Sequence, residues 1–215
     1  ITTTHTFTAT AEVVRYMGAD PVFVDIDPGS YCIDPAALEA HVTPRTRAIM
    51  PVHYAGYPCD MDAIAALAER HGLRVIEDAA HSFPTLYRGQ LIGTLPSAAT
   101  VFSFYATKTI ATGEGGMLVT RDEAIARRAR IMRLHGIDRD VWSRFTSDKP
   151  SWEYDVVAPG YKYNLPDLAA AIGLAQLERA EELHRERERC ARFYLQELAD
   201  VPGLELRLVE GLRQQ

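Results

Sequence analysis

Residues 60–77 read DMDAIAALAERHGLRVIE and contain a helix, a turn and a strand in immediate succession. Asp60 is a favoured residue at a helix N-cap, and a helical pattern follows it as far as His71. Gly72 is the residue found most often just past the end of a helix. Leu73–Glu77 is then a short run with adjacent β-branched residues, which predicts a strand. A helix that leads directly into a strand is half of a βαβ unit, so this stretch favours an α/β fold with a mostly parallel sheet.

The same alternation extends in both directions along the chain. There is no internal repeat and no low-complexity tract. Gly136–Lys162 is long and irregular and contains Trp142 and Trp152, and loops of this length are usually functional or mobile. The other predicted strands are Ile1–Thr3, Pro21–Ile26, Arg47–Val52, Thr100–Phe104 and Gly116–Thr120, and the other predicted helices are about Thr8–Met17, Asp34–His41, Asp122–Leu134, Pro166–Leu177 and Glu181–Leu198.

Composition indicates an ordinary globular protein. The 215 residues are 47% hydrophobic, 24% charged and 9% aromatic, which excludes a disordered, collagen-like or coiled-coil chain. The chain has 23 Lys and Arg against 29 Asp and Glu, and the net charge of −6 argues against non-specific binding of nucleic acid or acidic membranes. No apolar stretch approaches the roughly 18 residues of a membrane span. We therefore expect neither nucleic acid nor a membrane as a partner.

The cysteines and the chain ends bear on the cellular context. Cys32, Cys59 and Cys190 are odd in number, widely spaced and without a CxxC motif. This pattern favours reduced thiols in a cytoplasmic protein over a disulfide framework or a zinc site. The chain starts at Ile1 inside a strand-like run without a signal-peptide pattern, and its last residues, 209–215, complete no recognisable element. We therefore expect a segment of a longer protein.

Chemically active side chains follow the predicted strands. In open α/β sheets, ligands bind beyond the carboxyl ends of the strands. Carboxylates, imidazoles, aromatic rings, hydroxyls and an amine all occur at these ends, and a purely structural sheet would not require them. We therefore expect one ligand site at this edge of the sheet. The residues that follow the strands include Phe7, Asp25, Asp27, His53, Tyr54, Asp78, His81 and Lys108.

Lys108 and Asp78 are more informative as a pair than singly. Alone, Lys108 is a surface lysine at a strand end, and Asp78 is a helix N-cap or half of an ion pair. A partly desolvated lysine suits Schiff-base chemistry, because burial favours its neutral, nucleophilic form. A pyridoxal phosphate enzyme needs such a lysine for the aldehyde and an acid to keep the pyridine nitrogen protonated. The pair therefore points to pyridoxal phosphate as a candidate cofactor.

Three further residues have a functional and a structural interpretation each. Ser103 is a plausible donor to a phosphate near Lys108, or an ordinary hydroxyl on a strand. His81 could orient Asp78, or could be a satisfied buried histidine. Phe7 could stack on a flat ring beyond a strand end, or belong to the core. The sequence alone leaves these alternatives open.

Several patterns favour structural interpretations. Gly113-Glu-Gly-Gly116 lacks the ending of a P-loop and the spacing of a dinucleotide fingerprint, so a tight turn is the better interpretation. His53, His81 and His135 lack the spacing of metal ligands, so no metal site is expected. The charged run Glu181–Arg189 is typical of a solvated helix face with i,i+4 ion pairs.

Five motifs in order resemble one known family. They are PVHYAG at Pro51–Gly56, IEDAAH at Ile76–His81, FSFYATK at Phe102–Lys108, GEGG at Gly113–Gly116 and GYKYN at Gly160–Asn164. Together they resemble the DegT/DnrJ/EryC1/StrS sugar aminotransferases, which use pyridoxal phosphate on the fold-type-I scaffold. Within this family the chain looks most like the UDP-4-amino-4-deoxy-L-arabinose–oxoglutarate aminotransferases. The likeness covers most of residues 1–200.

The resemblance implies a three-layer α/β/α fold that is truncated at both ends. Residues 1–185 would form the large, cofactor-binding domain, and residues 186–215 would start an incomplete small C-terminal domain. Members of the family are nearly twice as long as this chain. Their glycine- and threonine-bearing phosphate loop lies upstream of the first strand seen here, so this segment alone could bind the cofactor poorly.

The resemblance also implies roles for individual residues. Lys108 resembles the lysine that holds the cofactor and then moves a proton, and this lysine argues for transamination because related sugar dehydratases have histidine in its place. Asp78 resembles the partner of the pyridine nitrogen. Asn164 resembles an asparagine that reaches the phosphate of the neighbouring subunit's cofactor, which implies a homodimer with shared sites. The remaining matches are Phe7 as the stacking aromatic, His81 beside the cofactor, Ser103 as a phosphate ligand, and His53, Tyr54 and His135 as weaker candidates on the substrate side.

The expected function is that of a cytoplasmic, pyridoxal phosphate-dependent aminotransferase. It would move an amino group from glutamate to a nucleotide-linked keto-sugar, and the product would enter lipopolysaccharide, another surface glycan or an amino-sugar metabolite. Two alternatives stand beside it. One is a non-catalytic or regulatory domain that retains this scaffold, and the other is a nucleotide-binding α/β domain without pyridoxal phosphate.

Overall fold

The computed structural model describes residues 1–138, 154–204 and 206. Residues 139–153 of the predicted irregular segment, with Trp142 and Trp152, lie outside the described residues.

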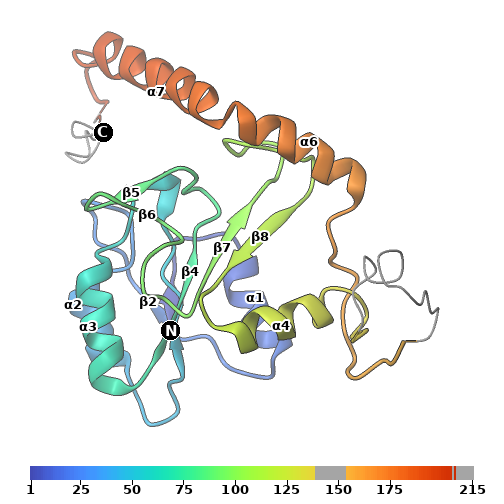
Figure 1. Cartoon of the computed structure of the whole chain (residues 1–215). Coiled ribbons are helices and arrows are strands. Elements are labelled where there is room, and N and C mark those ends of the chain that lie inside the picture. Colours follow the sequence, from blue (N-terminus) through green and yellow to red (C-terminus); the bar gives the residue numbers. More distant parts are fainter. Residues whose placement is uncertain (139–153, 205, 207–215) are drawn as a thin grey trace.

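The chain folds into layers around a central sheet (Figure 1). The helices α2 (Pro35–Leu38) and α3 (Met61–His71) lie on one side of the sheet. On the other side lie α1 (Ala9–Tyr16) and α4 (Glu123–Met132). The predicted α/β/α architecture is confirmed.

The strands of the central sheet run parallel up to its last member. β1 pairs with β2, and a bridge between Thr2 and Met50 joins β1 to the chain that follows β3. The remaining order is β3-β4-β7-β8, in which the final pairing is antiparallel. The predicted mostly parallel sheet is therefore confirmed, with β8 as the antiparallel strand. The bounds are Thr2–Thr3 for β1, Phe23–Val24 for β2, Ala48–Ile49 for β3, Arg74–Asp78 for β4, Ala99–Ser103 for β7 and Gly116–Val119 for β8.

Aspartates begin the helices α2, α3 and α4. The carboxylates of Asp34, Asp60 and Asp122 accept hydrogen bonds of 2.9, 3.1 and 2.8 Å from backbone N–H groups of the first helical turn. These bonds satisfy donors that the helix itself leaves without a partner. Gly72 ends α3 in the left-handed region, at φ 62°. The start and end predicted for this helix are confirmed.

A short hairpin follows β4 and was not predicted. It consists of β5 (Leu86–Tyr87) and β6 (Gln90–Leu91), which pair antiparallel. Arg88 and Gly89 between them both have positive φ, at 49° and 79°, as a two-residue hairpin turn requires. Strands of two residues are too short to leave an alternating pattern in the sequence, which is why sequence reasoning missed them.

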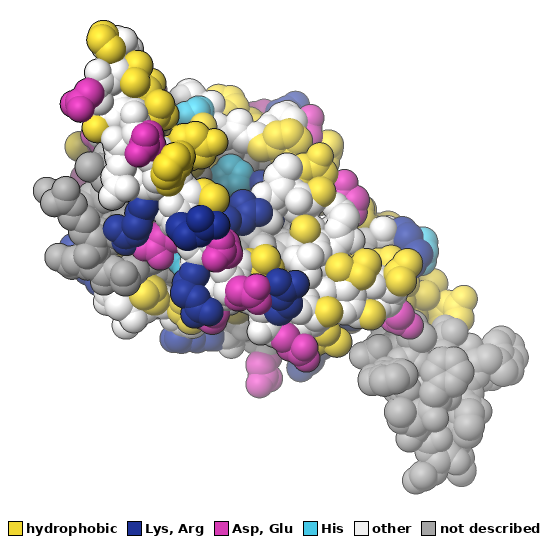
Figure 2. All heavy atoms as spheres, turned by 90° about the horizontal axis from the view of Figure 1, so that it is seen from above, with side chains coloured by type: hydrophobic (Ala, Val, Ile, Leu, Met, Phe, Trp, Pro, Cys, Tyr) yellow, Lys and Arg dark blue, Asp and Glu magenta, His cyan; other side chains and the backbone are white. Residues whose placement is uncertain are grey.

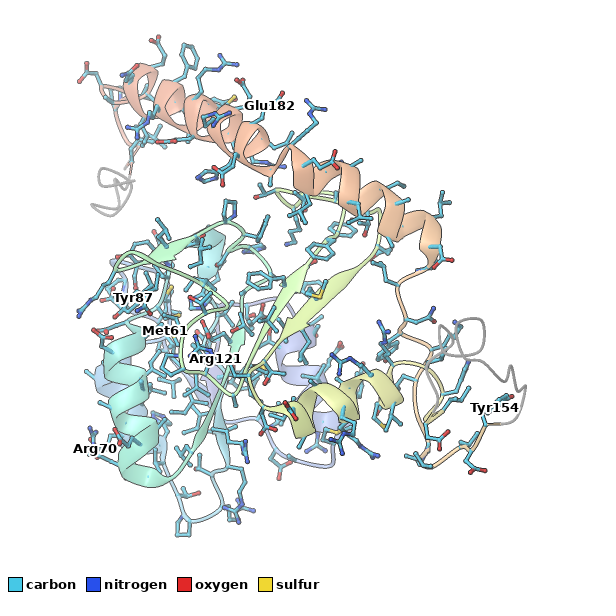
Figure 3. The ribbon with its side chains drawn as sticks, in the orientation of Figure 1. Met61, Arg70, Tyr87, Arg121, Tyr154 and Glu182 are labelled. Atoms are coloured by element: carbon cyan, nitrogen blue, oxygen red, sulfur yellow. The ribbon has the colours of Figure 1, made fainter. Side chains whose placement is uncertain are left out.

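The core lies between α3 and the sheet. Ile49 on β3 and Ile64 on α3 are completely buried, and Leu67 and Phe102 are nearly so. Full burial of one such side chain stabilises the fold by about 1.5–3 kcal/mol. In Figure 3, Met61 and Arg70 mark opposite ends of α3, with Tyr87 of the hairpin close to the Met61 end. The core thus holds α3, the hairpin and the sheet edge together.

Two consecutive helices, α6 (Asp167–Glu178) and α7 (Ala180–Glu197), lie across one end of the sheet (Figure 1). Figure 2 looks down on this end and shows side chains of both charges side by side. Along α7, ion pairs join Arg189 to Glu186 and Arg192 to Glu188. The predicted run thus carries a surface ion pair, but Arg189 and Glu186 are spaced i,i+3, and the i,i+4 pair involves Arg192 beyond the run. No described helix is long and apolar enough to span a membrane.

Candidate active site

Lys108 lies on a closed connection between two neighbouring strands. Residues 104–115 link β7 to β8, and we call them the lysine loop. Phe104 closes its base, because its N–H donates to the carbonyl of Gly115 at 2.8 Å and its carbonyl accepts from Thr112 at 2.9 Å. Lys108 is half-buried, and this burial lowers the pKa of its amine. The loop therefore presents an amine with an enlarged neutral fraction.

Asp78 is the last residue of β4, the strand next to β7. Its Oδ2 accepts a hydrogen bond of 2.7 Å from the buried hydroxyl of Thr10 on α1, and its Oδ1 accepts one of 3.2 Å from the N–H of Ala80. The residues after it form turns rather than a helix, so Asp78 is not a helix N-cap. Its negative charge raises the pKa of Lys108, although burial outweighs this effect. The carboxylate is thus close enough to Lys108 to act on it.

His81 lies in the same electrostatic environment. Its Nδ1 accepts a hydrogen bond of 3.2 Å from the backbone N–H of Ala55. Burial lowers the pKa of His81, the charge of Lys108 lowers it further, and Asp78 opposes both. A neutral ring that accepts at Nδ1 carries its proton on Nε2. His81 therefore offers an Nε2–H donor.

An open pocket of about 1330 Å³ brings four of the predicted site residues together. Tyr54, His81, Ser103 and Lys108 line it. Ser103 is half-buried, and its Oγ accepts from the N–H of Tyr105 at 3.2 Å. The pocket continues from this amine end toward the turn around Ser30, the β5–β6 hairpin and α7. A cavity of this size accommodates a cofactor together with a substrate.

Aromatic rings and imidazoles form one wall beside this pocket. The rings of His5 and Tyr54 lie 4.0 Å apart between centroids, and Tyr31 and His81 each lie edge-on to Tyr54 at 6.3 Å. Nδ1 of His5 is buried and has no hydrogen-bond partner among the described residues. This wall combines flat apolar surfaces with polar edges, a combination that suits a ring-bearing ligand.

His53 is placed differently from its predicted substrate-side position. It is 0% exposed, and its Nε2 lies 2.8 Å from Oε2 of the equally buried Glu77. Its Nδ1 accepts the N–H of Cys59 at 3.1 Å, so both ring nitrogens are engaged within the core. Burial acts to raise the pKa of Glu77, but hydrogen bonds from His53, Ser97 and other donors lower it on balance. His53 belongs to the support beneath the site, because an imidazole with both nitrogens engaged has none left for a substrate.

Five predicted site residues do not line the pocket as the described residues define it. Asp78 and His53 are described above, and the other three are Phe7, Asn164 and His135. Phe7 is 77% exposed near the end of the loop between β1 and α1. Asn164 precedes α6 and accepts a hydrogen bond from Nζ of Lys162. His135 is exposed, has φ 57°, and donates from its backbone to Tyr161 at 2.7 Å. Their predicted roles toward a cofactor, a second subunit and a substrate stay predictions.

Sequence reasoning missed several residues that the fold brings to the site. Thr10 binds Asp78 across 68 positions of sequence, and no local pattern indicates this bond. His184 and Arg187 line the pocket from α7, although they lie within the run interpreted as a solvated face. The one sequence signal for these two residues was the presence of His184 in a run made up mostly of charged residues.

The sequence profile of the DegT/DnrJ/EryC1/StrS aminotransferase family matches residues 1–212. The chain belongs to this family. Membership agrees with the resemblance carried by the five motifs. Two of these motifs, FSFYATK and GEGG, lie at the two ends of the lysine loop.

Individual relatives of the DegT/DnrJ/EryC1/StrS family support the same assignment. The spore coat polysaccharide biosynthesis protein SpsC of Bacillus subtilis is 51% identical over 95% of this chain and 52% of its own length. The putative sugar aminotransferase Spr1654 of Streptococcus pneumoniae, solved in its PMP-form, is 32% identical with a TM-score of 0.84, over 93% of this chain and 54% of that one. DesI, solved in the presence of its TDP-sugar product, is 38% identical with a TM-score of 0.76, over 93% of this chain and 47% of that one. The chain therefore spans about half the length of the relatives it matches.

The residues of this DegT/DnrJ/EryC1/StrS chain fit pyridoxal phosphate. A partly buried amine, a carboxylate that acts on its pKa, and a hydroxyl at a strand end are the groups that such a cofactor needs. Among the described residues, no group of three or more His, Cys, Asp and Glu is placed to hold a metal ion. The amine and the carboxylate agree with family membership, which implies pyridoxal phosphate.

Proposed function

We propose that this chain is the greater part of the cofactor-binding domain of a pyridoxal phosphate-dependent sugar aminotransferase. The observation that supports this most directly is the pairing of Lys108 with Asp78. Asp78 ends β4, Lys108 lies on the loop that follows the neighbouring strand β7, and the charge of Asp78 raises the pKa of Lys108. A structural lysine has no need for this combination of burial and an opposing carboxylate.

Four side chains would hold the cofactor. Lys108 would bind its aldehyde carbon, Asp78 would face the pyridine nitrogen, Ser103 would donate to the phosphate, and Phe7 would cover the ring. Bound there, pyridoxal phosphate would supply an electron-withdrawing ring that makes the Cα–H bond of an amino donor acidic.

The chain's own residues would move and hold protons. The lowered pKa of Lys108 gives its amine a neutral fraction. The neutral amine could take a proton from Cα of the donor and deliver it to the carbon that carries the aldehyde of the free cofactor. The hydroxyl of Thr10 donates to Oδ2 of Asp78 and so fixes the orientation of the carboxylate. Nε2–H of His81 would donate to an oxygen in the pocket. A hydrogen bond or a charge of the described residues supports each of these proposed roles.

The proposed substrates are glutamate as amino donor and a nucleotide-linked keto-sugar as acceptor. DesI with its TDP-sugar product and SpsC in spore coat polysaccharide synthesis support this class. The extension of the pocket past Tyr54 toward the β5–β6 hairpin leaves room for a substrate much larger than glutamate. We also propose a homodimer in which Asn164 serves the neighbouring subunit's cofactor, a small domain that begins near residue 186, and a cytoplasmic location.

Trapping the cofactor on the full-length protein tests this function. Pyridoxal phosphate is added, the product is reduced with borohydride, and the labelled peptide is identified by mass spectrometry. The chain has three lysines, Lys108, Lys149 and Lys162, and we expect the label on Lys108 alone. Absence of a label at Lys108, or equal labelling of the three lysines, would favour the non-catalytic or nucleotide-binding alternatives.

Glutamate and a panel of 3-keto and 4-keto nucleotide sugars then test the substrate class. Amino transfer to at least one member of the panel, abolished by Lys108→Ala, is expected. If the unreduced enzyme transfers the amino group of glutamate to free keto acids but to none of the sugars, the cofactor assignment stands and the proposed substrate class is wrong.

A further inference from the structure

Two polar side chains from α6 and α7 bond to the backbone of the lysine loop. Oε1 of Gln176 on α6 accepts a hydrogen bond of 2.8 Å from the N–H of Ala111. Nη2 of Arg187 on α7 donates to the carbonyl of Lys108 itself at 2.9 Å, with the carbonyl of Thr107 at 3.4 Å. The first bond spans 65 positions of sequence and the second spans 79. Both ends of the segment 107–111 are thus attached to helices that follow much later in the chain.

The backbone of α6 also approaches this loop closely. A Cβ added at Gly173 would lie 3.0 Å from Cγ2 of Thr112, which is tighter than ordinary van der Waals contact. Thr112 is buried and closes the loop through its N–H to Phe104. A glycine at this point of α6 lets the helix rest directly on the base of the loop.

Apolar packing contributes little to the rest of the lysine loop. Tyr105, Ala106, Thr107, Gly113 and Glu114 are exposed, whereas Ile110 and Thr112 are buried. A segment with few buried apolar side chains opens easily unless polar contacts hold it. The hydrogen bonds from Gln176 and Arg187 therefore hold the backbone of this loop in place.

We propose that Gln176 and Arg187 are positioning residues that hold the lysine loop so that the amine of Lys108 stays in the pocket. Arg187 is suited to this role because it lines the same pocket as Lys108 and bonds to that residue's own carbonyl. A loop released from these bonds would expose the amine to solvent and turn it away from Asp78. The importance of that amine rests on the proposed function. The positioning role itself rests on the two hydrogen bonds.

Paired variants of the full-length protein test the proposal. Gln176→Leu removes the acceptor for Ala111, whereas Gln176→Glu keeps an oxygen at the same place. Arg187→Met removes the donor but keeps the stem, whereas Arg187→Lys keeps one charged donor. Gln196→Leu and Arg189→Met on α7 are matched controls, because Gln196 is exposed and Arg189 pairs with Glu186 at the surface.

Hydrogen exchange of the cofactor-free protein is the first measurement. We expect Gln176→Leu and Arg187→Met to accelerate amide exchange within residues 105–112 by roughly tenfold, as the loss of one hydrogen bond implies. Gln176→Glu and Arg187→Lys should lie close to the unchanged protein, and both controls should equal it. Acceleration spread evenly over the whole chain would show a general loss of stability and overturn the proposal, as would no acceleration at all.

The reactivity of Lys108 is the second measurement. The rate of its borohydride-reducible attachment to pyridoxal phosphate should fall by roughly tenfold in Gln176→Leu and Arg187→Met, and the conservative variants should restore it. In turnover, kcat should fall while the KM values stay near those of the unchanged enzyme. Rates and kcat equal to those of the controls would overturn the proposal. A failure of the unchanged protein to label Lys108 would instead refute the proposed function, since the exchange measurement requires no cofactor.

Discussion

The imidazole of His53 and the carboxylate of Glu77 form a completely buried pair, with Nε2 and Oε2 2.8 Å apart. The second oxygen of Glu77 accepts from Thr100 at 2.9 Å, and the backbone N–H of His53 donates to the carbonyl of Asp78 at 3.0 Å. The pair therefore connects β4 to the chain beyond β3, at the residue next to Asp78. Because neither side chain reaches solvent, the hydrogen bond between them offsets part of the free-energy cost of burying both polar groups.

Removal of one partner of this pair is expected to destabilise the protein strongly. His53→Ala leaves the buried Glu77 without its main donor, and we expect the free energy of unfolding to fall by about 3–5 kcal/mol. Urea denaturation followed by circular dichroism measures this. Arg189→Ala, which breaks a surface pair on α7, is the matched control and should have little effect. A His53→Ala protein as stable as the control would refute the structural role of the pair.

The same pair predicts a dependence of stability on pH. The pKa of Glu77 is lower in the folded protein than in the unfolded chain, so between these two values the unfolded state binds more protons. The stabilisation from Glu77 is therefore present above its unfolded pKa and is lost as the pH falls through its folded pKa. Denaturation midpoints across this acidic range should fall less steeply for Glu77→Gln than for the unchanged protein. Equal slopes would contradict the prediction.

Asp78 is expected to tune the amine of Lys108 even without a cofactor. Because the charge of Asp78 raises the pKa of Lys108, Asp78→Asn should lower that pKa further. The pH dependence of acylation of Lys108 in the cofactor-free protein, followed by mass spectrometry, measures the shift. Asp200→Asn, which removes an exposed carboxylate far along the chain, is the control. An unchanged titration in Asp78→Asn would mean that the two groups do not interact.

His81 should be neutral near pH 7, with its proton on Nε2. Burial and the charge of Lys108 lower its pKa, and Nδ1 accepts the N–H of Ala55. Nitrogen NMR of the imidazole distinguishes the two tautomers and the charged ring. A charged His81, or a proton on Nδ1, would refute the assigned hydrogen bond.

Close backbone approach next to His135 makes one glycine intolerant of a side chain. A Cβ at Gly136 would lie 1.8 Å from the carbonyl oxygen of Ala158, and Gly136 has φ 74°. Gly72 has φ 62° but open space around it, so Gly72→Ala measures the cost of the backbone conformation alone, about 1 kcal/mol. Gly136→Ala should lower the melting temperature clearly more than Gly72→Ala does. If both variants lowered the melting temperature equally, the close approach to Ala158 would add nothing to the cost of the backbone conformation, and the prediction would be wrong.

Local sequence patterns predicted most of the secondary structure. The helix between Asp60 and Gly72 was predicted correctly because a cap and a left-handed glycine act within one turn of the chain. The β5–β6 hairpin was missed because each strand has two residues, which is too few for a periodic signal. Some predicted strands were longer than the observed ones: the run Pro21–Ile26 forms a strand only at Phe23–Val24, whereas the run Leu73–Glu77 matches β4 in length and is shifted by one residue.

The candidate site was predictable where its residues stand at strand ends. Tyr54, His81, Ser103 and Lys108 share one pocket because parallel strands bring their carboxyl ends to one edge. His53 follows a strand in the same way, yet its ring turns inward to Glu77. The direction in which a side chain leaves a strand end depends on its neighbours in space, and sequence position does not report them.

The sequence by itself determined the α/β class and the family motifs, because caps and β-branched runs act over a few residues and a motif is read directly from the order of residues. The tertiary structure alone decided which groups meet. Thr10 bonds to Asp78, Glu77 to His53 and Arg187 to the carbonyl of Lys108 across 68, 24 and 79 positions. Contacts over such separations arise from the packing of the whole chain, which no local pattern encodes.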